Sequence, residues 1–222
     1  MAMLTWDGTG QKLFETGTDR GVLYVLDSNN EYKPGVAWNG LTSVTESPSG
    51  ADSNKQYADN TIYANLRGAE EFGGTIEAFT YPDEWAVCDG SVIVKGGIVI
   101  GQQGRRTFGF SFRTKIGNDV DGLDHGYKLH LIYGATASPS ERSYETVNDS
   151  PEAATLSWEF DTVPVDVTIN GVQKKVSLLT IDSTKVAKAD LTKLETALYG
   201  GESADPYLPT PDQVIAMFTT TP

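Results

Sequence analysis

Phenylalanine occupies every second position of the segment 108–112, within the run Arg-Thr-Phe-Gly-Phe-Ser-Phe-Arg. This is the side-chain period of a β-strand with one buried face, whereas the apolar stripe of a helix repeats about every 3.6 residues. Two further segments, 127–133 and 155–161, alternate in the same way. The chain is therefore predicted to be mainly β, with strands that share a common core.

Composition limits the size of that core and the kind of ligand. The chain has 222 residues, of which 39% are hydrophobic. This is enough for one good core and does not require a second, so residues 1–222 are predicted to form a single domain. Seventeen basic against 30 acidic residues give a formal net charge of −13, which disfavours binding of nucleic acid through phosphate neutralisation.

No segment is predicted to enter a membrane. The N-terminal residues lack the basic flank and apolar run of a secretion signal, and no apolar stretch approaches the ~20 residues of a membrane span. The single cysteine, Cys88, cannot form an internal disulfide and agrees with a reducing compartment. We expect the protein to be made and kept in the cytosol.

One short helix, about 82–88, interrupts the strand pattern. Thr80-x-x-Asp83 has the form of a capping box, and Pro82 suits the first helical turn. Gly90 can adopt the left-handed conformation that ends a helix. The side chains expected on its buried face are Trp85 and Cys88. Such a helix in a β protein usually packs over the end or edge of a sheet.

A second helix, about 186–199, is predicted near the C-terminus. Its apolar face is expected to consist of Leu191, Leu194 and Leu198, and Gly200-Gly201 follows it directly. Beyond it, residues 200–222 are predicted to form an extended, proline-punctuated tail with one short apolar element.

Two connections between predicted strands differ in kind. Asn170-Gly171 is a strong signal for a two-residue hairpin turn. In contrast, the segment of about 46–60 is predicted to be a long polar loop, whose stretch 47–55 has no apolar residue larger than Ala51. The loop cannot form a core of its own, so it is either flexible or ordered by contact with a partner.

The most concentrated group of potential metal ligands lies in a polar turn. Asp119, Asp121 and Asp124 alternate in a loop that contains glycine, a pattern that suits calcium. However, the position where a calcium loop places a bidentate glutamate is His130 in this chain. A simple Asp/Gly turn is the favoured alternative.

Other catalytic patterns are weak. Cys88 is predicted to lie on a packed helix face, where a thiol behaves as a small apolar group. No serine has a Gly-x-Ser-x-Gly setting, and Gly101 to Gly104 lacks the glycine frame and lysine of a phosphate loop. The chain is therefore predicted to be neither an enzyme nor a binder of metals or other cofactors.

Several segments, in order along the chain, resemble the major tail tube proteins of long-tailed, non-contractile bacteriophages that infect Gram-positive bacteria. The longest is Ile-Glu-Ala-Phe-Thr-Tyr-Pro-Asp-Glu-Trp-Ala-Val-Cys-Asp-Gly at 76–90. The other matching segments are 36–41, 57–60, 70–73, 117–119, 125–130, 148–152, 157–159 and 208–215. Each is weak alone, but the ordered set is specific.

The resemblance implies a β-sandwich or partial barrel flanked by a helix. It also implies hexameric rings that stack into a tube, the conduit for DNA ejection into the host. The implied location is the virion tail, assembled in the host cytoplasm. The implied partners are further copies of the chain, the tape measure protein, and the distal tail and tail terminator proteins.

A tube of this kind gives the polar loop and the acidic residues a use. The loop could reach a neighbouring subunit, and a conduit for DNA should repel phosphates rather than bind them. The predicted inter-subunit residues are Glu46, Ser47, Pro48, Ser49, Gly50, Ala51, Asp52, Ser53, Asn54, Lys55, Gln56 and Tyr57. The acidic residues predicted to face the lumen are Glu70, Glu71 and Glu77, with Glu159 and Asp161 as second choices. An ordinary solvated outer face is an equal alternative for these carboxylates.

Two other functional classes stay open at this stage. One is a soluble β-sandwich that binds a carbohydrate or a protein. A carbohydrate site would need exposed aromatic side chains, and the candidates are Trp6 and Trp38. However, Trp38 lies in a segment that matches the tail tube proteins, and Trp6 could pack on the fold. A hydrolase is the second alternative.

Overall fold

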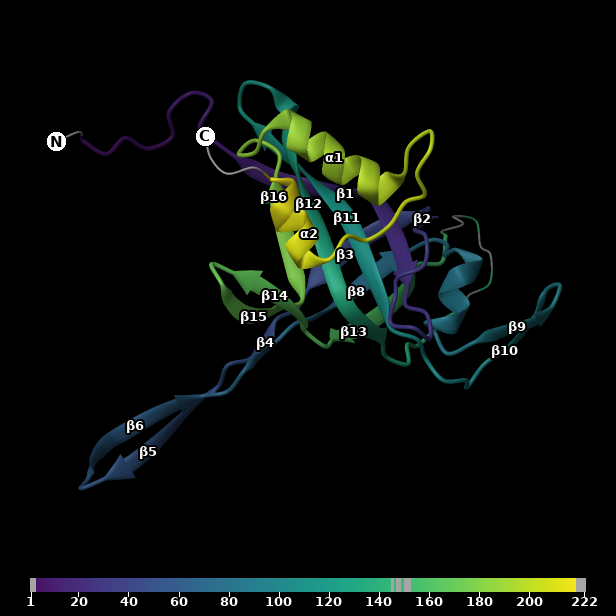
Figure 1. Cartoon of the computed structure of the whole chain (residues 1–222), viewed down its shortest axis with the longest axis horizontal. Helices are drawn as coiled ribbons and strands as arrows, with labels where there is room; N and C mark the ends of the chain where they lie inside the picture. Colours follow the sequence, from purple (N-terminus) through teal and green to yellow (C-terminus); the bar gives the residue numbers. More distant parts are fainter. Residues whose placement is uncertain (1–2, 145, 147–148, 150–152, 219–222) are drawn as a thin grey trace.

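The computed structural model describes residues 3–144, 146, 149 and 153–218. Its centre is one large antiparallel sheet with strand order β2-β1-β11-β12-β13-β8-β3, in which β16 also pairs with β12 (Figure 1). These strands are β1 (Phe14–Val25), β2 (Val36–Trp38), β3 (Leu41–Glu46), β8 (Gly73–Ala78), β11 (Phe108–Asn118), β12 (Gly122–Ala137), β13 (Leu156–Thr162) and β16 (Leu178–Asp182). The mainly β prediction is confirmed. The matching segment 148–152 lies, apart from Asp149, outside the described residues.

Strand β12 belongs to two parts of this sheet. Its residues 128–132 pair with β16, whereas residues 135–137 pair with β13. Gly134 lies between the two stretches with a positive φ of 63°, and a Cβ there would collide with the carbonyl oxygen of Val163. The change of partner at this glycine lets the β13-β8-β3 part fold over β1 and β11.

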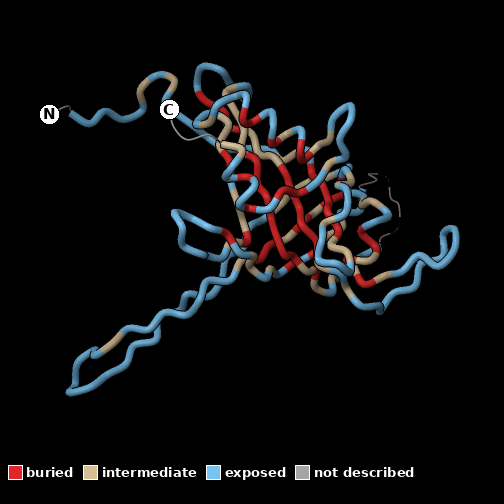
Figure 2. Tube along the Cα trace, in the orientation of Figure 1, coloured by how far each residue is buried: buried red, intermediate tan, exposed pale blue. Residues whose placement is uncertain are grey.

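The inner core fills the space between these two parts of the sheet. The alternating phenylalanines of β11 all point into it, as the sequence predicts, and they meet Trp158 and Phe160 from β13. Three tryptophans pack closely: the ring centroids of Trp38 and Trp85 lie 4.7 Å apart, and those of Trp85 and Trp158 lie 5.6 Å apart. Figure 2 shows these buried segments gathered in the middle of the body.

The helix-side core lies on the other face of β1, β11 and β12, under α1 (Lys188–Tyr199) and α2 (Pro211–Met217) (Figure 1). The three predicted leucines of α1 all point into it. Tyr24 and Tyr133 cross it with hydroxyl groups that donate to the carbonyls of Leu198 and Pro209, both at 2.9 Å.

The C-terminal elements differ in detail from the prediction. Helix α1 begins two residues later than the predicted 186–199. The tail of about 200–222 is not wholly extended, because Pro211–Met217 forms α2. A capping box between Thr210 and Gln213 and a proline in the first turn begin that helix.

The short helix predicted at 82–88 is a 3₁₀-helix, η1 (Asp83–Val87). The predicted capping box is wrong: the N-cap is Pro82, which has no side chain to cap with, and the carbonyl of Thr80 accepts a hydrogen bond from the Trp38 indole instead. Trp85 and Cys88 are both fully buried, as predicted.

Three hairpins stand out from the body. The longest, residues 47–72, is called the arm below and consists of β4 (Ser49–Gly50), β5 (Ser53–Ala58), β6 (Thr61–Arg67) and β7 (Glu70–Glu71). The others are β9 (Val92–Lys95) with β10 (Ile98–Ile100), and β14 (Val165–Ile169) with β15 (Val172–Val176). The last turns at Asn170-Gly171, both with positive φ, which confirms that prediction.

The arm corrects the secondary structure predicted for 46–60. These residues form the end of β3, then β4 and β5, and the turn lies at the end of the segment, at Asp59-Asn60, both with positive φ. Strand β4 and the first half of β5 escaped prediction because residues 49–55 are polar or small, so no alternation marks them. Figures 1 and 2 show the arm projecting far from the body and exposed along its length.

Candidate assembly surfaces

Three of the five predicted lumen residues lie together on one sheet face. Glu77 on β8 lies opposite Ser157 on β13 and Ser43 on β3, Glu159 lies opposite Thr75, and Asp161 lies opposite Gly73. Directly opposed residues of antiparallel strands share a face, and the intervening residues point into the inner core. The acidic strand face consists of Ser43, Thr45, Thr75, Glu77, Ser157, Glu159 and Asp161.

The acidic strand face is polar throughout and carries no basic side chain. Glu159 and Asp161 are exposed, and Glu77 is half-buried with its Oε2 accepting a hydrogen bond from Ser43 Oγ at 2.7 Å. Within the described residues, none of these three carboxylates is paired with a cation, so together they give this part of the sheet a negative field.

The other two predicted lumen residues lie elsewhere. Glu70 and Glu71 form β7 at the base of the arm, opposite Gly50 and Ser49, and both are exposed. They are not part of the acidic strand face. Adjacent positions in a strand point to opposite sides, so these two carboxylates do not face one surface together.

The predicted inter-subunit residues form the end of β3 and one leg of the arm. All residues of β5 are exposed, and on β6 only Ala64 is half-buried. Large side chains stay in solvent near the tip, where Tyr57 lies opposite Ile62, with exposed fractions of 68% and 53%. The arm therefore offers a two-stranded surface that no described part of this chain covers.

Glu46 connects the arm to the centre of the sheet. Its Oε1 lies 3.0 Å from Nδ1 of His130, a residue that is only 8% exposed. The imidazole stacks on Phe112 with ring centroids 4.5 Å apart, and its Nε2 lies 3.0 Å from Thr114 Oγ1. This contact could not be predicted from sequence patterns, because Glu46 and His130 are far apart along the chain.

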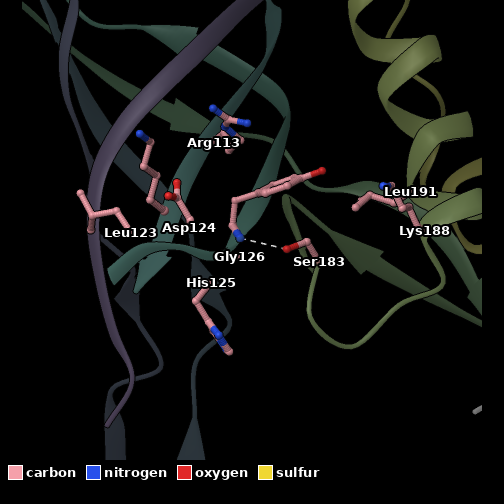
Figure 3. Close-up of a pocket in the computed structure, with 10 residues that line it drawn as sticks. Arg113, Leu123, Asp124, His125, Gly126, Ser183, Lys188 and Leu191 are labelled. Atoms are coloured by element: carbon pink, nitrogen blue, oxygen red, sulfur yellow. Dashed lines mark hydrogen bonds between the residues drawn. The ribbon is translucent and has the colours of Figure 1, made fainter. Parts of the chain in front are cut away.

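A hollow of about 410 Å³ lies between β11, β12 and the start of α1 (Figure 3). Its basic side chains include Arg113, which donates two hydrogen bonds of 2.6 Å to Asp19 and lowers the pKa of that carboxyl. Ser183 Oγ accepts a hydrogen bond from the Tyr127 backbone, drawn as the dashed line, whereas His125 contacts Asn118 and Asp121. Ser183 and His125 therefore do not form a nucleophile and base pair.

Two aspartates of the polar turn, Asp119 and Asp121, accept hydrogen bonds from this chain. Asp119 Oδ1 accepts a hydrogen bond from the Gly10 backbone at 3.0 Å. Asp121 Oδ2 lies 3.1 Å from His125 Nδ1 and 3.1 Å from Asn118 Nδ2, and these two hydrogen bonds lower the pKa of the Asp121 carboxyl. In the part of the chain that the structure describes, no three His, Cys, Asp or Glu side chains are grouped to hold a metal ion.

The exposure of Cys88, Trp38 and Trp6 decides which of them could react or bind a ligand. Cys88 is fully enclosed, and burial raises the pKa of its thiol to about 12, so the reactive thiolate is not formed near neutral pH. Trp38 is 3% exposed and cannot stack on a sugar, whereas Trp6 is 77% exposed and does not pack on the fold. Among the described helices, none is long and apolar enough to span a bilayer.

Comparisons with known proteins give only distant similarity. No protein family and no curated protein matches the sequence. One similar solved structure is the sheath–tube complex of an extracellular contractile injection system, PVC, in its extended state. It has 13% identity, the match covers 73% of this chain and 88% of that chain, and the TM-score is 0.31. Another is the anti-feeding prophage cap, described as the AFP tube terminating cap, with 12% identity, 82% and 97% coverage, and a TM-score of 0.31. These TM-scores are too low to assign a shared fold.

Proposed function

We propose that this protein is a structural component of a bacteriophage tail tube. Copies assemble into hexameric rings, and the rings stack into the conduit through which DNA is ejected into the host. The tape measure, distal tail and tail terminator proteins are its further partners. The protein assembles in the host cytoplasm and ends in the virion tail, and it catalyses no reaction.

The observation that carries this proposal is the acidic strand face. Glu77, Glu159 and Asp161 lie on one side of neighbouring strands, among hydroxyl side chains and without a cation. A wall of this composition repels the phosphates of passing DNA and offers them no binding site. In the proposed ring this face lines the lumen.

The arm and the open sheet edges support self-assembly. Among the described residues, none packs against β5 or β6 to offset the conformational entropy lost when the arm is ordered. Contacts with a second subunit would offset this loss. Strands β2 and β3 end the sheet, and edges of this kind are normally blunted or paired. Pairing between subunits would remove them.

The first test is negative-stain electron microscopy of the purified chain over a concentration series. Rings or tubes whose number rises with concentration are expected. A chain that stays monomeric at the highest soluble concentration, both alone and with the tail proteins of its own virion, would overturn the proposal.

The second test concerns the lumen. Virions complemented with E77K/E159K/D161K are expected to form tails but to eject DNA more slowly, with a difference that shrinks as salt screens the charges. The matched control reverses three exposed carboxylates outside the face, Glu31, Glu202 and Asp205. A separate variant, E70K/E71K, tests the arm base. Ejection is followed by fluorescence of a DNA dye, and equal rates in the lumenal variant and the control would remove the lumen assignment.

A further inference from the structure

The hairpin formed by β9 and β10 exposes apolar side chains on both of its faces. Val92 lies opposite Ile100 on one face, and Ile93 lies opposite Val99 on the other. The exposed fractions of the apolar residues are 41% for Val92, 44% for Ile93, 58% for Val94, 58% for Ile98, 56% for Val99 and 48% for Ile100. Figures 1 and 2 show this hairpin extending from the body into solvent. An apolar two-stranded hairpin is marginal in water by itself, so its surface indicates a partner.

A strand that is apolar on both faces fits a sheet that is covered on both faces. The main sheet offers such a place next to β1. There Val22 and Tyr24 point into the helix-side core, whereas Leu23 and Val25 point into the inner core. Strand β2 ends the sheet on this side, and within the described residues β1 is its only paired strand.

The edge of β2 is also bordered by a hollow of about 430 Å³ on the helix side. Its lining is mostly apolar and includes Val22, Ala37, Leu198 and Pro206. Ala37 lies opposite Val22, so its side chain faces the hollow, and it is exposed. Strands β2 and β10 have the same length, three residues each.

We infer that the β9–β10 hairpin of one copy adds to the β2 edge of a second copy through β10. One face of the hairpin then fills the hollow beside Ala37, and the other continues the inner layer of the sheet. We assign the occupant as a second copy because the same chain carries both the hairpin and the β2 edge. The two strands, β10 and β2, have equal lengths, and each is flanked by apolar side chains on both faces of its sheet. The only charged residue between 92 and 100 is Lys95, so like charge does not oppose its approach to a copy with a net charge of −13.

This contact deepens the proposed self-assembly and rests on it. The hairpin and the β2 edge are different surfaces, so the contact is heterologous and can repeat from copy to copy. It differs from the arm, whose exposed apolar side chains are interspersed with polar ones, because it buries both faces of the hairpin and extends a sheet.

Disulfide cross-linking tests the contact directly. Ala37→Cys in one chain is mixed with Val99→Cys or Ile100→Cys in another and then oxidised. The native Cys88 is fully buried and does not interfere. Residues 99 and 100 point to opposite faces of the hairpin, and a paired β10 turns only one of them toward the hollow. A covalent dimer is expected for one of the two mixtures. Cross-links in both, in neither, or equally with the control Val120→Cys would overturn the inference.

A second measurement separates this inference from the proposed function. I93K/V99K places two charges on the buried hairpin surface, so it is expected to raise the concentration needed for assembly at least about tenfold. The control V120K/L123K changes two exposed apolar residues of a different turn. Tubes that form equally well with I93K/V99K would overturn the hairpin contact and leave the tube proposal standing. Selective cross-links in a chain that never forms rings or tubes would support the contact and overturn the tube.

Discussion

The body and the arm of this molecule use the same secondary structure for opposite purposes. Strand β11 buries its side chains between two cores, whereas every residue of β5 is exposed. In the body, tertiary packing stabilises each strand, and in the arm only the hairpin hydrogen bonds do. We therefore expect changes in the body to affect folding, and changes in the arm to affect the proposed assembly without affecting folding. Four changes to the chain, in order of decreasing effect on stability, test this distinction.

Trp85→Ala should have the largest effect. The side chain is fully buried and lies within 6 Å of the rings of Trp38, Phe108 and Trp158. Removing it leaves a large cavity, and a loss of about 3–5 kcal/mol in the free energy of unfolding is expected from urea titration. Trp6→Ala is the control, expected within about 0.5 kcal/mol of wild type because the indole is 77% exposed. Similar losses in both variants would contradict the assignment of the inner core.

Tyr24→Phe should cost less. It keeps the ring in the helix-side core but removes the hydroxyl that donates to the Leu198 carbonyl at 2.9 Å. The carbonyl loses a buried donor, so a loss of about 1–1.5 kcal/mol is expected. Tyr57→Phe in the arm is the matched control and should leave thermal unfolding unchanged. If the two variants behave alike, the hydrogen bond from the sheet to α1 contributes nothing.

Asp19→Asn should remove a pH-dependent contribution to stability. Hydrogen bonding from Arg113 lowers the pKa of Asp19 in the folded state. The pair therefore stabilises the fold above the ordinary carboxyl pKa of about 3.9, and this contribution disappears as the pH falls through the lower folded-state value. The Asp19 side chain is 36% exposed, so solvent screening should keep the loss below about 1 kcal/mol at pH 7.

The measurement is the difference in unfolding free energy between wild type and Asp19→Asn at pH 7 and at pH 3. The difference should shrink at the lower pH. Asp166→Asn removes a more exposed pair with Lys175 and serves as the control. A difference that grows on acidification would reverse the expected sign.

Replacement of residues 51–69 by Asn-Gly should have the smallest effect on stability. It joins Gly50 to Glu70, which already lie opposite each other, by a two-residue hairpin turn. The body should unfold within about 0.5 kcal/mol of wild type, while rings and tubes disappear from electron micrographs. A marked loss of stability would mean that the arm supports the body, and normal tubes would mean that the arm is not an assembly element.

The sequence predicted those parts of the fold in which the alternation of apolar side chains matches their burial in the structure. Segments whose apolar side chains alternate with small or polar ones, such as the phenylalanines of β11 and Trp158 of β13, became strands whose alternating side chains point into the inner core. Asn170-Gly171 became a hairpin turn, because both positions must adopt positive φ there. Local chemistry alone specified these features.

Other parts could not be predicted because their partners are distant or absent. The arm lacks a buried face, so only the turn residues Asp59-Asn60 could have indicated its hairpin. The neighbourhood of Glu77 with Glu159 depends on pairing of β8 with β13, which periodicity cannot specify. The contact of Glu46 with His130 is equally non-local. The lumenal role of the carboxylates stays a prediction.

The partner change at Gly134 also sets the order in which a growing chain can finish folding. Strand β12 needs both β13 and β16, so its pairing cannot be completed until Asp182 has been synthesised. The β9–β10 hairpin is local and is complete about 80 residues before that, which is roughly 4–16 s at ~5–20 residues per second. During this interval, the β2 edge that we infer to receive the hairpin belongs to a sheet that is still incomplete. We therefore expect the inferred contact to form mainly between chains whose synthesis is nearly complete.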